Sequence, residues 1–132
     1  MKKLFLITLS IFTLFSCEDS ENLPAPYYSV DGKWLWSPDP DDRIYSNTMY
    51  EFDDGNVYTS YANCGSTDNL CTDADFNALD TTDRIPRVDT YTFDGDTLTW
   101  DEISRVVSFE CDGGIMLFEN GLKLWRLSSD CD

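Results

Sequence analysis

The sequence predicts an all-β domain in which about eight antiparallel strands form an up-and-down meander. Short runs rich in β-branched and aromatic residues alternate between apolar and polar positions, as Trp34 and Trp36 or Val107 and Phe109 do. This period of two residues is typical of half-buried strands. Turns rich in glycine, asparagine and aspartate separate the runs. No stretch with a helical period is long enough to predict more than a short helix.

The predicted strands follow one another along the chain with turns that suit tight hairpins. They span residues 33–37, 49–52, 57–61, 87–93, 97–101, 105–111, 115–119 and 122–127. Four turns supply the positive φ angles that hairpins need: Asp53-Asp54-Gly55-Asn56, Phe93-Asp94-Gly95-Asp96, Asp112-Gly113-Gly114 and Glu119-Asn120-Gly121. A long irregular insertion, residues 62–87, interrupts the meander, and we expect at most a short helical turn at residues 73–79.

Eight strands joined mostly by short hairpins can close into a barrel, which removes the exposed edges of the sheet. An open β-sandwich is the alternative architecture. The predicted domain, residues 31–132, is long enough for one hydrophobic core.

The first 16 residues have the pattern of a signal peptide. Met1-Lys2-Lys3 is positively charged, and the apolar run at residues 4–15 is shorter than the roughly 20 residues of a membrane-spanning helix. Leu14-Phe15-Ser16-Cys17 resembles the lipobox of bacterial lipoproteins, whose cysteine is acylated and becomes the new N-terminus. This resemblance implies that Cys17 carries a lipid, with palmitate among its acyl chains, and that this lipid attaches the protein to a membrane. An ordinary secretory signal with a chance cysteine is the alternative.

An acidic segment containing proline, residues 17–30, is predicted to be an extended tether. Its Glu18-Asp19-Ser20-Glu21 cluster resembles the surface-export signal of Bacteroidetes lipoproteins. The resemblance implies an outer-membrane protein displayed on the cell surface. An anchor facing the periplasm is the alternative.

The chain is strongly acidic and contains no histidine. It has 25 Asp and Glu against 9 Lys and Arg, a formal charge of −16. Cleavage after residue 16 would remove Lys2 and Lys3 and no acid, so the remaining chain would carry −18. Because a phosphate backbone is bound by clusters of Lys and Arg, these scattered cations argue against nucleic acid. The acidity instead indicates solubility, a marine or salty habitat, or attraction of cations and basic ligands such as a basic protein partner.

Four cysteines remain besides Cys17, and an even number in an exported chain predicts disulfides. Three connectivities are possible for four cysteines. Cys64 and Cys71 flank a short loop that a local disulfide would close, which leaves Cys111 to pair with Cys131. The lack of histidine and the cysteine spacing argue against a zinc site.

The start of the first strand and the end of the last carry a family resemblance. Asp31-Gly32-Lys33-Trp34 is similar to the G-x-W motif of lipocalins, and Arg126 lies where those proteins place an arginine across the tryptophan. Residues 31–127 resemble small lipocalin-like lipoproteins of Bacteroidetes. The resemblance implies a lipocalin-like barrel with Gly32, Trp34 and Arg126 at its base.

Alternating strand directions give a separate expectation for the two ends of such a barrel. The first strand starts at the end where the sixth and eighth finish, so Trp34, Arg126, Cys111 and Cys131 gather there. We call this end the base. A Cys111–Cys131 disulfide and stacking of Arg126 on Trp34 are then feasible. Loops 37–48 and 62–87 fall at the opposite end, the mouth, where a ligand would enter.

Aromatic residues on the predicted inner faces are the candidate ligand-binding residues. An eight-stranded barrel is just wide enough to fill with side chains or to hold one small molecule, so a packed core is the alternative. The candidates are Trp36, Tyr50, Phe52, Tyr61, Tyr91, Trp100 and Phe109.

Carboxylates of the mouth loops are the candidates for binding a metal. Asp39, Asp41 and Asp42 lie close together, and Ca²⁺ takes six to eight oxygen ligands. No EF-hand spacing is present, and aspartate is also an ordinary residue of exposed turns. We expect no other cofactor.

These features favour a binding protein over an enzyme. Without histidine there is no Ser–His or Cys–His pair, and no P-loop or dinucleotide fingerprint is present. The expected function is that of a membrane-anchored lipoprotein whose barrel binds a small apolar ligand or serves in the cell envelope. The alternative is a protein-interaction module or inhibitor with a packed core, acidic loops and an exposed tyrosine patch formed by Tyr27, Tyr28, Tyr45 and Tyr58.

Overall fold

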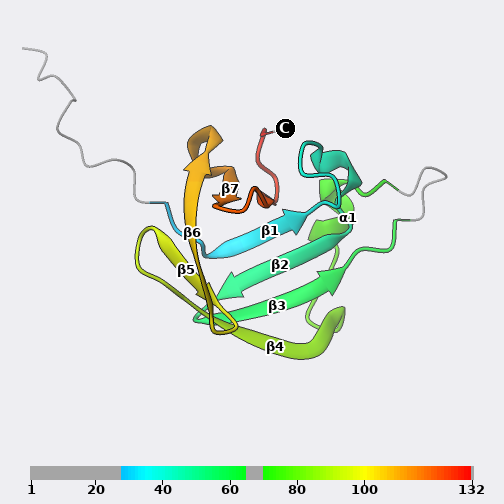
Figure 1. Cartoon of the computed structure of the whole chain (residues 1–132). Coiled ribbons are helices and arrows are strands. Elements are labelled where there is room, and N and C mark those ends of the chain that lie inside the picture. The colour runs from blue at the N-terminus through cyan, green and yellow to red at the C-terminus, as the bar shows by residue number, and fades with distance from the viewer. Residues whose placement is uncertain (1–27, 65–69, 132) are drawn as a thin grey trace, which may run out of the picture.

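A computed structural model of the chain describes residues 28–64 and 70–131. Eight antiparallel strands close into a barrel in sequential order, with the first strand paired to the last (Figure 1). They are β1 (Gly32–Trp36), β2 (Thr48–Asp53), β3 (Asn56–Tyr61), β4 (Arg84–Phe93), β5 (Thr97–Trp100), β6 (Ile103–Glu110), β7 (Ile115–Phe118) and β8 (Lys123–Arg126). The predicted all-β meander and closed barrel are therefore confirmed, and the open sandwich is excluded.

Short helical segments occur only between strands in the described ranges. They are η2 (Arg43–Tyr45), α1 (Asp73–Asn77) and η3 (Cys111–Gly113). The short helix expected within residues 73–79 is thus confirmed as α1. Strand β4 begins three residues earlier than predicted, because Arg84 pairs with Ser60 beyond an irregularity in the β3–β4 register. None of the described helices has the length and apolar character needed to span a membrane.

The main hydrophobic core fills the inside of the barrel. Trp34, Phe52 and Leu124 are almost inaccessible to solvent and come from β1, β2 and β8. They alternate along each strand with residues that face outward, as the sequence pattern predicts. Val30, the last residue of the predicted tether, is also buried in this core.

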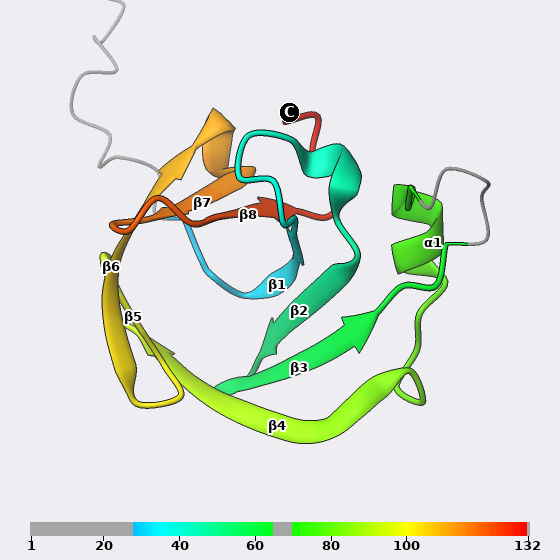
Figure 2. The ribbon, with the colours of Figure 1, turned by 45° about the vertical axis from the view of Figure 1, so that its right-hand side comes forward.

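Two smaller clusters cover the outer surface of the barrel. Phe76 of α1 packs with Leu35 and Met49 on the outside of β1 and β2. On the opposite flank of β1, Ile115 and Trp125 form a cluster with the tail residue Cys131. Figures 1 and 2 place α1 beside the end of β3, on the side of the barrel opposite β5 and β6. The insertion therefore covers one outer flank and leaves the β5–β6 side open.

The base of the barrel has the arrangement that the sequence predicts. Trp34 is 0% exposed and donates its indole N–H to the Val30 carbonyl at 2.7 Å. The Arg126 guanidinium carbon lies 4.3 Å from the centre of the Trp34 ring, within cation–π range. Gly32 has a φ of +116°, and a Cβ atom there would lie 3.0 Å from Arg126 Nη1. Glycine therefore allows the arginine to close over the tryptophan.

Both predicted disulfides are present. Cys64 pairs with Cys71, and Cys111 pairs with Cys131, with Cα–Cα distances of 5.1 and 6.1 Å. The second disulfide lies at the base, as the alternating strand directions predict. It joins the end of the β6 segment to the tail that follows β8.

Tyr91, a buried residue of β4, contacts the base of the barrel and makes the free energy of unfolding sensitive to alkaline pH. The Tyr91 hydroxyl donates a hydrogen bond to the Asp31 carboxylate. Burial is the main cause, and this bond the second, of a pKa raised to about 12. A raised tyrosine pKa means that folding favours the protonated phenol. The stability that the Tyr91 phenol contributes is therefore fully present below its pKa in the unfolded chain, about 10. This contribution is lost as the pH rises toward 12.

We expect wild type to lose on the order of 2 kcal/mol more stability than Tyr91→Phe between pH 10 and pH 12. Phenylalanine keeps the ring against Phe52 but has no proton to lose. Urea unfolding of both proteins from pH 8 to pH 12 measures the difference. A difference that stays constant over this range would show that Tyr91 does not govern alkaline unfolding.

Candidate ligand site at the barrel mouth

The predicted aromatic residues line the barrel interior, with one exception. Phe52 and Tyr91 are buried in the core, and Trp36, Tyr50, Trp100 and Phe109 pack against it. Tyr61 was expected inside and is instead 58% exposed. It is the last residue of β3, so its side chain lies past the core although it has the inward phase of Val57 and Thr59.

Edge-to-face packing fills the middle of the barrel. The Trp100 ring lies 4.8 Å from that of Tyr50 and 5.2 Å from that of Phe52, and Phe52 lies 5.0 Å from Tyr91. These separations are those of aromatic rings in direct contact. The rings of this cluster therefore fill the space between them.

A cavity of about 210 Å³ remains at the mouth, where β5, β6 and the β7–β8 turn meet. Leu98 and Phe118 are buried there, and Ile103 at the opening is 55% exposed. Of the residues predicted to bind ligand, only Trp100 lines this space. The full lining is Leu98, Trp100, Ile103, Arg105, Phe118, Asn120 and Leu122.

Arg105 is the charged member of this lining. It pairs with Leu98 across the β5–β6 ladder and shares the inward phase of Val107 and Phe109. The side chain is half-buried. Within residues 28–64 and 70–131 no hydrogen bond or ion pair to Arg105 is found. The cavity thus combines apolar walls with one guanidinium that has no partner.

The other described arginines all have acceptors. Arg43 pairs with Asp73, Arg84 with Glu51, and Arg87 with both Asp89 and Asp101. Arg126 donates to the carbonyl oxygens of Ser29, Asp31 and Gly113. An unpaired arginine is therefore a local exception in a chain rich in carboxylates.

The Asp89 carboxylate, which contacts Trp100 of the cavity lining, is already engaged by other groups. The Asp89 carboxylate accepts from Arg87 Nε at 2.5 Å and from the Trp100 indole at 3.2 Å. Burial is the main cause of a raised pKa at Tyr50, and the neighbouring Tyr61 and Asp89 add to it. The raised pKa favours the neutral form of the Tyr50 phenol.

Sequence reasoning missed Arg105, although the alternation of β6 carried a signal. Residues 105, 107 and 109 share one face of the strand, and a charged residue on an otherwise apolar face marks a special position. The pattern also placed the ligand site too deep, because it identifies the inward face but not the level at which packing stops.

The three aspartates proposed as metal ligands make local contacts within their loop and with Lys123. No group of three or more metal-ligating side chains is found among the described residues. The Asp39 carboxylate accepts from the Asp41 backbone N–H, and that of Asp42 from the Ile44 backbone N–H, so they serve as turn and cap residues. Asp41 lies 3.5 Å from Lys123 Nζ.

The expected tyrosine patch is not formed by its described members. Tyr28 packs against Phe109 near the base, and Tyr58 lies under the Arg84 guanidinium. Tyr45 is half exposed in η2, between β1 and β2. These residues come from separate parts of the barrel. Tyr27 and the candidate lipidation residue Cys17 lie outside the described ranges.

The mouth cavity can bind and orient a small molecule, with apolar contacts on its walls and a charge-assisted hydrogen bond from Arg105. Arg105 supplies an anion-binding group, and Leu98 and Phe118 supply buried apolar surface. Comparisons with protein-family models, with curated proteins and with solved structures found no match to this chain.

Proposed function

We propose that this chain is a lipid-anchored outer-membrane lipoprotein whose lipocalin-like barrel binds a small apolar molecule carrying an anionic group. The observation that supports it is the unpaired Arg105 guanidinium in the apolar mouth cavity. On this proposal the barrel is a binding module and carries out no catalysis.

The chemistry of arginine favours a planar anion such as a carboxylate. A guanidinium offers paired N–H donors that match two carboxylate oxygens. Hydrogen bonds that involve a charged group contribute roughly 1.5–3 kcal/mol. The acidic chain repels anions at long range, but exposed charges are screened beyond about 8 Å at physiological ionic strength. The direct contact therefore outweighs the distant carboxylates.

The remaining space suits a short apolar group. Burial of apolar surface contributes about 25 cal/mol per Å², and Leu98, Phe118 and Leu122 provide such surface. The cavity of about 210 Å³ is small, so the ligand we propose is shorter than a membrane lipid acyl chain. A larger molecule would have to extend past Ile103 into solvent.

The anchor we propose agrees with the position of the described N-terminus. The chain enters the barrel at Tyr28–Val30, next to Trp34 and Arg126 at the base. A lipid on Cys17 would therefore connect to the end opposite the mouth cavity. This arrangement lets a ligand reach Arg105 without competition from the membrane surface.

Membrane attachment is tested with the full chain and its Cys17→Ser variant in a Gram-negative host. We expect wild type to incorporate labelled palmitate and to sediment with the outer membrane. The variant should incorporate no label and leave the membrane fraction. Equal sedimentation of the two proteins would contradict the anchor.

Ligand binding is tested with hexanoate and hexan-1-ol, which share a chain length and differ in charge. We expect Arg105→Gln to weaken hexanoate binding about tenfold or more, from the loss of a charge-assisted contact, and to leave hexan-1-ol unchanged. Nuclear magnetic resonance titration measures both affinities and locates the site through the Trp100 indole resonance.

Lys33→Gln is the matched control, since it removes one positive charge from β1 outside the cavity. It should bind hexanoate like wild type. Loss of hexanoate affinity in this control equal to that of Arg105→Gln would attribute the effect to net charge. Absence of any binding by hexanoate and hexan-1-ol would contradict the mouth site.

A further inference from the structure

The structure assigns a second binding site outside the barrel, and we propose that it takes a primary amine bearing a short apolar chain. The site is a cavity of about 390 Å³ between η2 and α1, above the outer face of β1. Leu35, Ile44 and Phe76 supply apolar walls, and Asp42, Arg43 and Ser46 supply polar groups. It does not include any residue of the mouth cavity.

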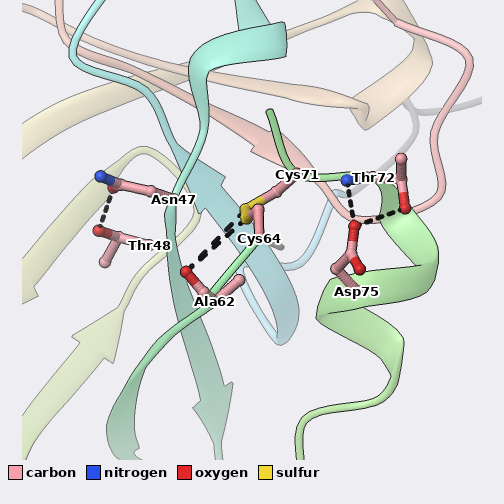
Figure 3. Close-up of a disulfide and its surroundings, with 7 residues drawn as sticks. All are labelled: Asn47, Thr48, Ala62, Cys64, Cys71, Thr72 and Asp75. Carbon is pink, nitrogen blue, oxygen red and sulfur yellow. Dashed lines mark hydrogen bonds between the residues drawn. A yellow bond between two sulfur atoms is a disulfide. The ribbon is translucent and has the colours of Figure 1, made fainter. Parts of the chain in front are cut away.

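Several cross-links hold the two walls of this cavity together. Arg43 of η2 forms an ion pair with Asp73 of α1, and its other terminal nitrogen donates to the Ser129 carbonyl at 2.8 Å. The Cys64–Cys71 disulfide fixes the chain that leads into α1 (Figure 3). The two Arg43 contacts join segments far apart in sequence, so the cavity is a pre-formed site.

Ser46 gives the first indication of a ligand. Ser46 is one of the residues that line the cavity, and it is only 3% exposed. In the part of the chain that the structure describes, its hydroxyl is the buried side-chain polar atom without a hydrogen-bond partner. Because buried polar groups are nearly always satisfied, such a group points to a partner that the described residues do not provide.

The charges around the cavity determine the sign of that partner. Arg43 is already neutralised by Asp73, so it attracts no further anion. The Asp42 carboxylate accepts the Ile44 backbone N–H and has no cationic partner among the described residues. The uncompensated charge at the cavity is therefore negative, which favours a cation and disfavours an anion.

A primary ammonium group matches both polar groups. It has three N–H donors, enough to reach the Ser46 hydroxyl oxygen and the Asp42 carboxylate together. The attached chain would cover Leu35, Ile44 and Phe76. A quaternary ammonium has no N–H to donate to Ser46, and a metal ion would make no favourable contact with the apolar walls. The site is therefore complementary to an amphiphilic amine.

The test uses hexylammonium as the probe on the disulfide-bonded chain, followed by ¹H–¹⁵N chemical-shift titration. We expect shifts at Ile44, Ser46 and Phe76. Hexan-1-ol should bind this site at least fivefold more weakly, because it cannot pair with Asp42. Hexylammonium that shifts no residue around the cavity would overturn the proposal.

Two variants test the contacts separately. Asp42→Asn keeps an oxygen to cap Ile44 but removes the charge, and we expect at least a fivefold loss of hexylammonium affinity. Asp41→Asn removes one negative charge from the preceding residue, which does not line the cavity. This variant should change the hexylammonium affinity less than twofold. Equal losses in the two variants would show non-specific attraction to the acidic loop and overturn the site.

Ser46→Ala provides a readout that a purely structural role would not produce. Because it removes an unsatisfied buried hydroxyl, we expect an unchanged or raised melting temperature together with a fivefold or greater loss of hexylammonium affinity. A lowered melting temperature with wild-type affinity would assign Ser46 a structural role and overturn the proposal. The mouth cavity is independent of this result, since hexanoate binding is followed at Trp100.

Discussion

Replacing Trp34 with alanine will lower the free energy of unfolding by about 3–5 kcal/mol, the range for removal of a large aromatic side chain from a packed core. The indole is 0% exposed, lies 6.2 Å from the Phe109 ring, and is covered by Arg126. Its removal leaves a cavity at the base and takes away the hydrogen bond to Val30. It also leaves Arg126 without the aromatic face on which its guanidinium rests.

Urea unfolding followed by far-ultraviolet circular dichroism measures this effect without depending on tryptophan fluorescence. Trp36→Ala is the matched control, since Trp36 lies two residues further on the same strand face and is only half-buried. The loss scales with the area buried, so the control should cost less stability than Trp34→Ala. A Trp34→Ala protein no less stable than Trp36→Ala would contradict the role of the base as the most tightly packed part of the barrel.

The base could be predicted because its residues follow from two rules that need no distances. Alternation assigns Trp34 to the inner face, and alternating strand direction brings the ends of β1, β6 and β8 together. The Cys111–Cys131 pair and the Arg126 contact then follow from which ends meet. Local turn residues fixed the strand boundaries to within a few positions, since glycine is needed where φ is positive, as at Gly55.

The mouth could not be predicted in the same way, because its shape depends on register. Strand β4 pairs with β3 through residues 56–60 and with β5 only through Tyr91, Thr92 and Phe93. Such a stagger decides which residues lie at the same height along the barrel. It also leaves Tyr61 beyond the core. Strand phase alone gives the face of each residue and not its height along the barrel.

The packing of α1 against the outside of the barrel depends on tertiary contacts, which the sequence of a five-residue helix does not predict. So short a helix is not stable by itself, and its apolar residue Phe76 is stabilised by burial against Leu35 and Met49. The Asp75 carboxylate accepts from the Thr72 backbone N–H and hydroxyl, both at 2.7 Å, and these bonds lower the pKa of Asp75. The local sequence predicted a helical turn there, and only the fold shows which surface it covers.

Removal of the Cys111–Cys131 disulfide, as Cys111→Ser with Cys131→Ser, will destabilise the barrel by about 3 kcal/mol. The chain-entropy relation gives this magnitude for a sequence separation of 20 residues. The bridge also holds the tail over Ile115 and Trp125 on the outside of β7 and β8. Gly114 shows how closely the tail is packed, because a Cβ atom there would lie 2.2 Å from Cys131 Sγ.

The matched control is Cys64→Ser with Cys71→Ser, which opens a disulfide with a separation of seven residues. A shorter loop gives a smaller entropic loss, about 2.5 kcal/mol by the same relation, and no part of the cluster at Trp125 depends on it. We therefore expect lower denaturation midpoints for both proteins and greater solvent access to Trp125 only without Cys111–Cys131, seen as a red shift of fluorescence. If both variants lost the same stability with unchanged fluorescence, the tail would be held by its contacts to β7 and β8 alone, and the disulfide would act only on the unfolded chain.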